Sequence, residues 1–307
     1  MPPADPDHAI RLAALEEVRD LSRVFQQLVP RDVLLEGFEF EGARISYGSF
    51  QRGIHRSSRQ SGPGALTVTT TPPVPGKVPP YDDGLDEQTG TFLYHYRTGS
   101  PDIADNRALR AAAELQAPLI YFKGIAPGQY MPIAPVFAID QPAEHLVQLA
   151  KGLPHQDTAG EGMVSSEIVR RYEFREVRRR MHQVQFRRDV LYAYRDRCAI
   201  CSLNQPDLLE ASHIVRDADE RGIAAIVNGL ALCAIHHRAY DRNLVGIDPR
   251  GKVHLSQRLL REVDGPMLGN GLQHFHGAEI LQPRRTEDRP DPDLLELRFS
   301  QFESAET

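Results

Sequence analysis

The three cysteines of the chain fall into two short motifs with the same spacing. Two residues separate Cys198 from Cys201, and two separate Cys233 from His236. This spacing lets both side chains of a pair face one ion, and three thiolates with one imidazole suit tetrahedral zinc. Four protein ligands leave no position for water, so the sequence predicts a structural Zn²⁺ site. The alternative is buried cysteines and a surface histidine that share this spacing by chance.

The residues around these two pairs resemble the HNH nuclease family. The chain has SHI at 212–214, NGLALC at 228–233 and HHRAYD at 236–241. This order, after the first Cys pair, agrees with the zinc-stapled branch of the family over about residues 185–256. The resemblance implies a ββα-metal fold, in which a His, an Asn and a second His surround one divalent ion. It also implies an endonuclease that hydrolyses phosphodiester bonds.

Phosphodiester hydrolysis gives these residues distinct roles. The reaction needs a hydroxide, a cation on the phosphate and a proton for the leaving oxygen. His213 is the candidate general base, because a neutral imidazole accepts a proton near pH 7. Asn228 is expected to hold the loop and to orient His213 through an amide hydrogen bond.

His237 and Asp241 are the candidate ligands of a catalytic Mg²⁺ or Mn²⁺. They lie four residues apart on a predicted helix and so share one face. One imidazole and one carboxylate leave positions open for water and phosphate. Many members of the family carry an acid directly before the first His, but here that residue is Ser212. The metal is therefore expected to depend on His237 and Asp241. His237 also completes the predicted catalytic set, together with His213 and Asn228.

A second group of aromatic and acidic residues lies far upstream. The chain has YDD at 81–83, FLYHY at 92–96 and NRAL at 106–109. This order resembles the SRA (SET- and RING-associated) domain over about residues 35–140, with the strong matches confined to 79–115. The resemblance implies a PUA-like β-barrel that binds double-stranded DNA carrying a flipped 5-methylcytosine or 5-hydroxymethylcytosine.

A flipped cytosine needs two stacking faces and an acceptor for its amino group. The resemblance implies Tyr81 and Tyr96 as the stacking residues. Tyr94 is two residues before Tyr96 on a predicted strand, so it shares that face and could be the pocket wall instead. Asp83 is the better-placed acceptor and Asp82 the reserve. The alternative is that these tyrosines belong to the ordinary core of a barrel.

The pattern of apolar residues predicts the elements that carry these groups. Helical spacing opens the chain and ends at Pro30, short apolar runs between turn residues then predict strands, and a polar stretch with Gly and Pro precedes a long helix. The expected fold class is α+β, with an SRA/PUA-like β-barrel before a ββα-metal domain. The expected domains are an N-terminal helix (1–30), an SRA-like modified-DNA-binding domain (31–140), a linker (141–164), a basic helix plus HNH nuclease (165–275) and a C-terminal tail (276–307).

The long helix expected at 165–195 is basic. From Arg170 to Arg197 the chain has ten arginines against four acids, although the net charge of the whole chain is -6. An excess this one-sided is more often an anion-binding surface than a solvated helix face. We therefore expect DNA phosphates to contact Arg178, Arg179, Arg180, Arg187 and Arg188.

The overall composition is that of an ordinary soluble globular protein. Of 307 residues, 41% are hydrophobic and 25% charged, which excludes a fully disordered chain. The acidic balance argues against a protein that coats nucleic acid by bulk charge. There is no apolar run long enough for a membrane span and no signal peptide pattern, so a cytoplasmic protein is expected.

The order of the two motif regions resembles the SRA–HNH modification-dependent restriction endonucleases of bacteria. The resemblance implies a type IV-like restriction enzyme that cuts DNA near a modified cytosine. One active site cuts one strand, so we expect a homodimer, with the N-terminal helix as the candidate contact. Two alternatives stay open: a modified-DNA-binding protein without catalysis, and an HNH nuclease that reads another modification or RNA.

Overall fold

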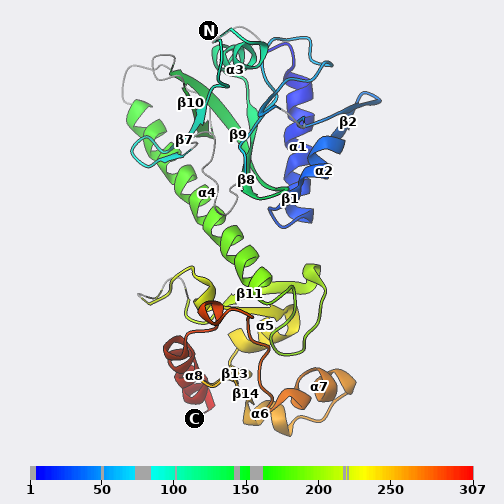
Figure 1. Cartoon of the computed structure of the whole chain (residues 1–307), viewed down its shortest axis with the longest axis vertical. Helices are drawn as coiled ribbons and strands as arrows, with labels where there is room; N and C mark the ends of the chain where they lie inside the picture. Colours follow the sequence, from blue (N-terminus) through cyan, green and yellow to red (C-terminus); the bar gives the residue numbers. More distant parts are fainter. Residues whose placement is uncertain are drawn as a thin grey trace. The chain divides into compact units, whose positions relative to one another are not determined.

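A computed structural model gives the structure of the chain and describes residues 5–49, 52–72, 84–100, 102–141, 146–152, 162–216, 219 and 221–306. The chain divides into two compact units, Met1–Met181 and His182–Thr307. The division falls inside the long helix α4 (Gly162–Ala193), drawn in green in Figure 1. The fold is mixed α+β, as expected, while the domain boundaries drawn from the sequence stay predictions.

The first unit is built on one sheet whose described strands follow the order β4-β5-β8-β9-β10-β7-β6, with β1 also paired to β9. Neighbours are antiparallel except for β5 and β8. The strands are β1 (Val29–Pro30), β4 (Ile54–His55), β5 (Thr67–Thr69), β6 (Leu85–Asp86), β7 (Thr91–His95), β8 (Leu119–Ala126), β9 (Gln129–Gln141) and β10 (Leu146–Lys151). Beside the sheet lie a hairpin of β2 (Phe38–Phe40) and β3 (Ala43–Ile45) and the helices α1 (His8–Val24), α2 (Arg31–Glu36) and α3 (Ala104–Glu114).

The closed barrel expected from the sequence is not found among the described residues. The sheet ends at β4 on one side and at β6 on the other, and these two strands are not paired with each other. Each has only two residues, so neither offers the continuous ladder of hydrogen bonds that closes a barrel.

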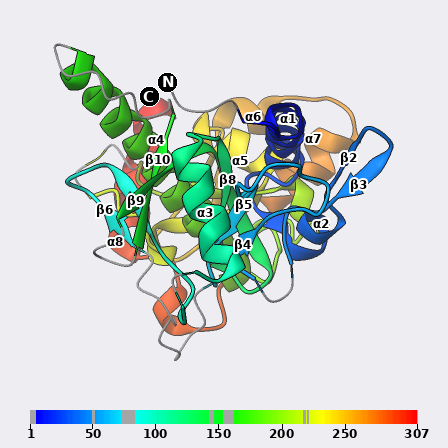
Figure 2. The same ribbon diagram turned by 90° about the horizontal axis from the view of Figure 1, so that it is seen from above.

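Side chains of the central strand β8 alternate between two hydrophobic cores, one on each face of the sheet. Ile120 and Phe122 join a core with residues of α1. Leu119 and Tyr121 join the opposite core with residues of α3 and of the first part of α4. Figure 2 shows β8 between α1 and α3.

The expected N-terminal helix is confirmed as α1. Its residues Ile10, Ala14 and Val18 recur at helical spacing and are buried in the first unit, so this helix packs on the core of its own domain. The helix ends well before Pro30, because Gln26 and Gln27 adopt left-handed φ values of 47° and 72°. A dimer contact through α1 stays a prediction.

The interval 141–164, expected to be a linker, contains a strand of the sheet. Leu146–Lys151 form β10, which lies between β9 and β7 in the sheet. Leu146, Val147 and Leu149 are buried there. The average polarity of the interval conceals this short apolar run, which belongs to the core of the first unit.

The second unit contains a hairpin followed by a helix, the ββα arrangement that the HNH resemblance implies. Strands β11 and β12 pair antiparallel from Leu209↔Cys233 to His213↔Gly229, and α5 follows β12 directly. A second hairpin and three helices complete the unit. The elements are β11 (Leu209–His213), β12 (Gly229–Cys233), α5 (Ala234–Asp241), β13 (Val245–Ile247), β14 (Val253–Leu255), α6 (Gln257–Arg261), α7 (Pro266–Gly271) and α8 (Pro292–Glu306).

The segment 276–307, expected to be a C-terminal tail, contains α8, which packs on the second unit. Leu294 and Leu295 belong to the same hydrophobic core as the ββα elements. Phe302 lies so close to β13 that a Cβ added at Gly246 would stand 2.6 Å from its ring. The acids Asp293, Glu296 and Glu303 of α8 lie on its exposed face.

No helix in the described part of the chain is both long enough and apolar enough to cross a membrane.

Candidate active site and metal centre

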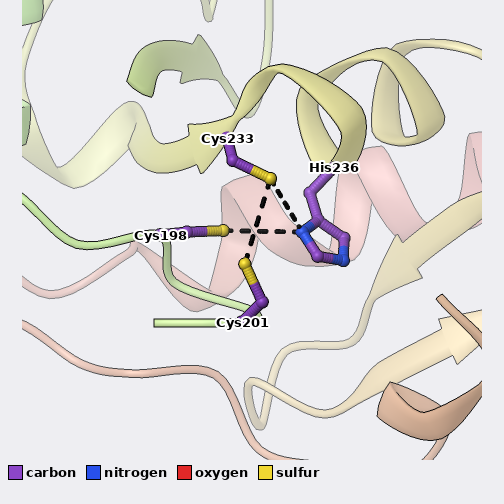
Figure 3. A group of neighbouring side chains, drawn as sticks. All are labelled: Cys198, Cys201, Cys233 and His236. Atoms are coloured by element: carbon purple, nitrogen blue, oxygen red, sulfur yellow. Dashed lines mark hydrogen bonds between the residues drawn. The ribbon is translucent and has the colours of Figure 1, made fainter. Parts of the chain in front are cut away.

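The two Cys/His pairs meet at one point in the second unit. Their four ligand atoms lie within 4.8 Å of one another, and Figure 3 shows the three sulfurs and the His236 ring around a common centre. The Sγ atoms of Cys198 and Cys233 lie 3.6 and 3.1 Å from His236 Nδ1. The N–H of Ala199 donates to Ala231 O at 2.6 Å, which fixes the first pair against β12.

The donor chemistry of this group fits a zinc ion. Cys198, Cys233 and His236 are buried, and burial lowers the pKa of His236, but its bonds to the two thiols outweigh burial and bring the pKa to about 9. Hydrogen bonding with Cys198 lowers the pKa of Cys233, which accepts, and raises that of Cys201, which donates. Three thiols and an imidazole thus compete for protons at one point, where a soft divalent cation satisfies them together. The group can therefore hold Zn²⁺ through all four side chains.

His213 ends β11 and faces a small cavity. Its ring stacks on Phe186 of α4, with centroids 4.0 Å apart and planes at 12°. The cavity has a volume of ≈ 270 Å³ and is also bordered by Asp241, the last residue of α5. The structure therefore brings the predicted general base and one predicted metal ligand to the same cavity. Its described lining is His213, Ile214, Val215, Arg216, Asp219, Asp241, Asn243, Arg298 and Gln301.

Asn228 is fully buried behind the loop that follows His213. Its Oδ1 accepts from the N–H of Val215, and its Nδ2 donates to the carbonyls of Val215 and Ile223, each at 2.9 Å. Its backbone carbonyl accepts from the N–H of Ile214 at 2.9 Å. These bonds hold the loop, and they fix the backbone next to His213. The expected amide bond to the His213 ring stays a prediction.

His237 lies between two carboxylates. Its Nδ1 contacts Glu210 Oε2 of β11, and its Nε2 lies 3.6 Å from Asp241 Oδ2. The two nitrogens of an imidazole point in different directions, so the two acids occupy opposite sides of the ring. The Nε2 side is the one that faces Asp241, so the predicted metal shared with Asp241 would bind there, and Glu210 contacts the ring from the other side.

Glu210 is a functional candidate that the motif comparison missed. Side chains alternate along a strand, so Glu210 and Ser212 lie on the same face of β11. Position 212 is where many HNH nucleases carry their acid, and Ser212 is buried here. The alternation of side chains along β11 is therefore the feature of the sequence that points to Glu210 as an acid near the proposed metal.

The predicted DNA-binding arginines differ in their surroundings. Arg187 donates to the carbonyls of Leu209 and Pro206 at 2.9 and 3.3 Å, Arg188 pairs with Asp189 at 3.1 Å, and Arg178 pairs with Glu87. Arg179 is exposed and Arg180 half-buried. The structure therefore leaves Arg179 with the freest access to solvent among these five arginines.

Tyr94 of β7 and Tyr96, which follows the end of this strand, lie in the core of the first unit. Tyr94 and Tyr96 share one face, as strand periodicity predicts, and each is 5% exposed. The Tyr94 hydroxyl donates to Thr69 O at 3.4 Å. Beyond Tyr96, Asn106 of α3 fixes the chain by exchanging hydrogen bonds with the backbone of Arg97, at 3.0 and 3.1 Å.

A cavity of ≈ 310 Å³ in the first unit includes Thr69, the hydrogen-bond partner of Tyr94, in its wall. Pro72 also lines this cavity, and the predicted pocket residues follow it in the sequence, at 81–83. Those residues, Tyr81, Asp82 and Asp83, lie outside the described residues.

Comparison with known proteins identifies the second unit. No curated protein matches the chain. A solved structure titled "Modification dependent TagI restriction endonuclease" has 15% sequence identity and a TM-score of 0.29, with 82% of this chain and 86% of that chain covered. The HNH endonuclease family matches residues 198–248, a stretch that holds both Cys/His pairs, His213, Asn228, His237 and Asp241. Residues 198–248 therefore carry an HNH endonuclease domain.

Proposed function

We propose that the protein is a modification-dependent DNA endonuclease of the type IV-like restriction class. Its first unit reads 5-methylcytosine or 5-hydroxymethylcytosine, and its HNH domain hydrolyses a phosphodiester bond with one divalent metal ion. The observation that carries the nuclease mechanism is the cavity shared by His213 and Asp241.

Residues in and near that cavity have distinct roles in the proposed reaction. His213 takes a proton from the attacking water, and its stacking on Phe186 fixes the plane of the imidazole. Asp241 and His237 Nε2 hold Mg²⁺ or Mn²⁺, which when bound neutralises charge on the phosphate. Glu210 orients His237 through Nδ1. Asn228 holds the loop after His213.

The Cys/His group has a structural role in this proposal. Zn²⁺ on Cys198, Cys201, Cys233 and His236 fixes α5 to the turn before β11, because the four ligands come from both segments. His236 and His237 are neighbours on α5, so the zinc also fixes the start of the helix that carries His237 and Asp241.

The modified base is proposed to bind in the first unit, at the cavity beside Thr69 and Pro72. The resemblance of 79–115 to SRA domains supports this, and Tyr81 or Tyr96 would stack on the base while Asp83 or Asp82 accepts its amino group. Tyr94 is not part of the cavity wall, but its hydroxyl donates to the carbonyl of Thr69, which is. Arg178, Arg179, Arg180, Arg187 and Arg188 are proposed to meet the DNA backbone as the two units engage one duplex.

One assay tests this function as a whole. Plasmid with 5-methylcytosine, plasmid with 5-hydroxymethylcytosine and unmodified plasmid are each incubated with the full chain, with and without Mn²⁺. We expect cleavage of modified plasmid in the presence of metal only. Cleavage of all three plasmids at equal rates contradicts base reading, and binding of modified DNA without any cleavage contradicts the catalytic assignment.

A further inference from the structure

The cavity that holds His213 and Asp241 has a wall that comes from outside the family match. Arg298 and Gln301 line it, and both belong to α8 at the C-terminal end of the chain. The HNH match ends at residue 248. The C-terminal segment therefore supplies side chains to a cavity whose other walls come from the nuclease motif.

Arg298 is held firmly at this position. Its Nη1 donates to Asn243 Oδ1 at 2.6 Å, its Nη2 donates to the carbonyl of Tyr240, and its guanidinium carbon lies 4.6 Å from the centre of the Tyr240 ring. These partners are uncharged, so they orient the guanidinium without neutralising it. An arginine has five N–H donors, and those two bonds leave three available for a ligand.

The charges that line the cavity leave a place for an anion once a metal is bound. Among the described lining residues, Arg216 and Arg298 balance Asp219 and Asp241. A divalent cation on Asp241 adds two positive charges and makes the cavity cationic. A phosphodiester supplies one negative charge and two non-bridging oxygens, which can accept two parallel N–H bonds from a guanidinium group.

We propose that Arg298 binds the non-bridging oxygens of the scissile phosphodiester, so that α8 completes the active site. This inference rests on the proposed nuclease function. Arg298 then acts on the side of the phosphate that the metal does not contact, and it stabilises the charge that grows there during hydrolysis. In this proposal the C-terminal segment, although acidic in composition, contributes the positively charged side chain of Arg298 to the active site.

The experiment compares single-turnover cleavage and DNA affinity of full-chain variants. Arg298→Gln is expected to lower the cleavage rate of modified plasmid by about 10²-fold. On a fluorescent duplex containing 5-methylcytosine, it also reduces the salt slope of binding by about one. Arg298→Lys recovers part of the rate, because it keeps the charge but loses the fork. The matched control is Arg258→Gln, on exposed α6, which leaves both readouts unchanged.

A second variant keeps every contact of Arg298 intact, in case Arg298→Gln unfolds the unit. Gln301→Glu adds a negative charge to the cavity wall, and Ser300→Glu adds the same charge at the preceding, exposed residue of α8, which is not part of the lining. We expect Gln301→Glu alone to slow cleavage and weaken binding. Equal behaviour of these two variants, or wild-type cleavage by folded Arg298→Gln, overturns the proposal.

The two proposals fail in different ways. A wild-type chain that cuts no DNA with Mn²⁺ contradicts the nuclease mechanism, while the salt slopes of the Arg298 and Gln301 variants still report whether a phosphate binds there. A wild-type chain that cuts, with unchanged slopes and rates in these variants, contradicts the role of Arg298 alone.

Discussion

His213 is the residue on which the proposed chemistry depends most directly. Its imidazole stacks on Phe186 and borders the cavity with Asp241. We expect His213→Ala to lower the single-turnover cleavage rate by about 10²- to 10⁴-fold, because it removes the group that deprotonates water. DNA affinity and melting temperature should stay near wild type. His182→Ala, an exposed histidine in the same unit, serves as the control, and equal rates for the two variants would contradict the assignment.

Glu210 gives a second prediction at this scale, read out by metal affinity. Glu210→Ala removes the carboxylate that contacts His237 Nδ1, and the loss of such a partner commonly costs 10- to 100-fold in metal affinity. We expect a weakening of that order in calorimetric titration of the zinc-loaded protein with Mn²⁺, with partial recovery in Glu210→Gln. The control is Glu262→Ala at an exposed position. An unchanged Mn²⁺ affinity in Glu210→Ala would show that Glu210 does not support the ligand.

The site residues divide into those that local spacing reveals and those that it does not. The Cys/His set and the pair His237 and Asp241 could be predicted, because each pair lies within one turn or one helix. Glu210 and His237 are 27 residues apart, and Arg298 and Asn243 are 55 apart. Contacts of this kind depend on how β11, α5 and α8 pack, which no local pattern in the sequence encodes.

At the scale of elements, the proposed zinc joins the turn at 198–201 to the start of α5. Cys198 and His236 are almost fully buried, so folding and metal binding should be coupled. We expect one zinc per chain by elemental analysis, and loss of zinc with reduced stability in Cys198→Ser. Saturating zinc stabilises the fold by about 4 kcal/mol at a free concentration a thousand times Kd. Wild-type zinc content and stability in this variant would exclude the site.

The contact between α8 and β13 is a second feature of this scale. A Cβ at Gly246 would meet the ring of Phe302 at 2.6 Å, and overpacking of this kind costs about 1–3 kcal/mol. We expect Gly246→Ala to lower the free energy of unfolding by that amount in urea denaturation. Gly265→Ala is the matched control, since an added Cβ there meets nothing within 4 Å. Equal stabilities would mean that α8 is not packed on β13.

Element prediction succeeded where the sequence pattern is long and failed where it is short. Helix α4 has 32 residues with a clear pattern, and its presence was expected. Strand β10 has six residues inside a polar interval, and α8 buries few side chains among many acids. Average composition assigns both to loops, although Leu149 and Leu295 are almost fully buried. The pairing of strands and the open edges at β4 and β6 are likewise set by the tertiary fold.

At the scale of the whole molecule, the local charge of one segment differs in sign from the net charge of the chain. The chain carries a net charge of -6, yet ten arginines occur between Arg170 and Arg197. An acidic total lowers the general attraction to DNA, while a local basic segment preserves contacts to a bound duplex. This distribution favours an enzyme whose binding depends on recognition of a base, because bulk attraction contributes little.

The number of chains needed for a double-strand break follows from the site. The described chain presents one cavity with His213 and Asp241, and one such site cuts one strand. We therefore predict that a break in both strands within one encounter involves two chains. We expect mixtures of wild type with His213→Ala, at constant total protein, to accumulate nicked plasmid at the expense of linear plasmid as the variant fraction rises. Mixed pairs carry one active cavity and cut one strand. If a single chain instead cuts both strands in succession, added variant slows both products equally and the ratio of nicked to linear plasmid stays constant.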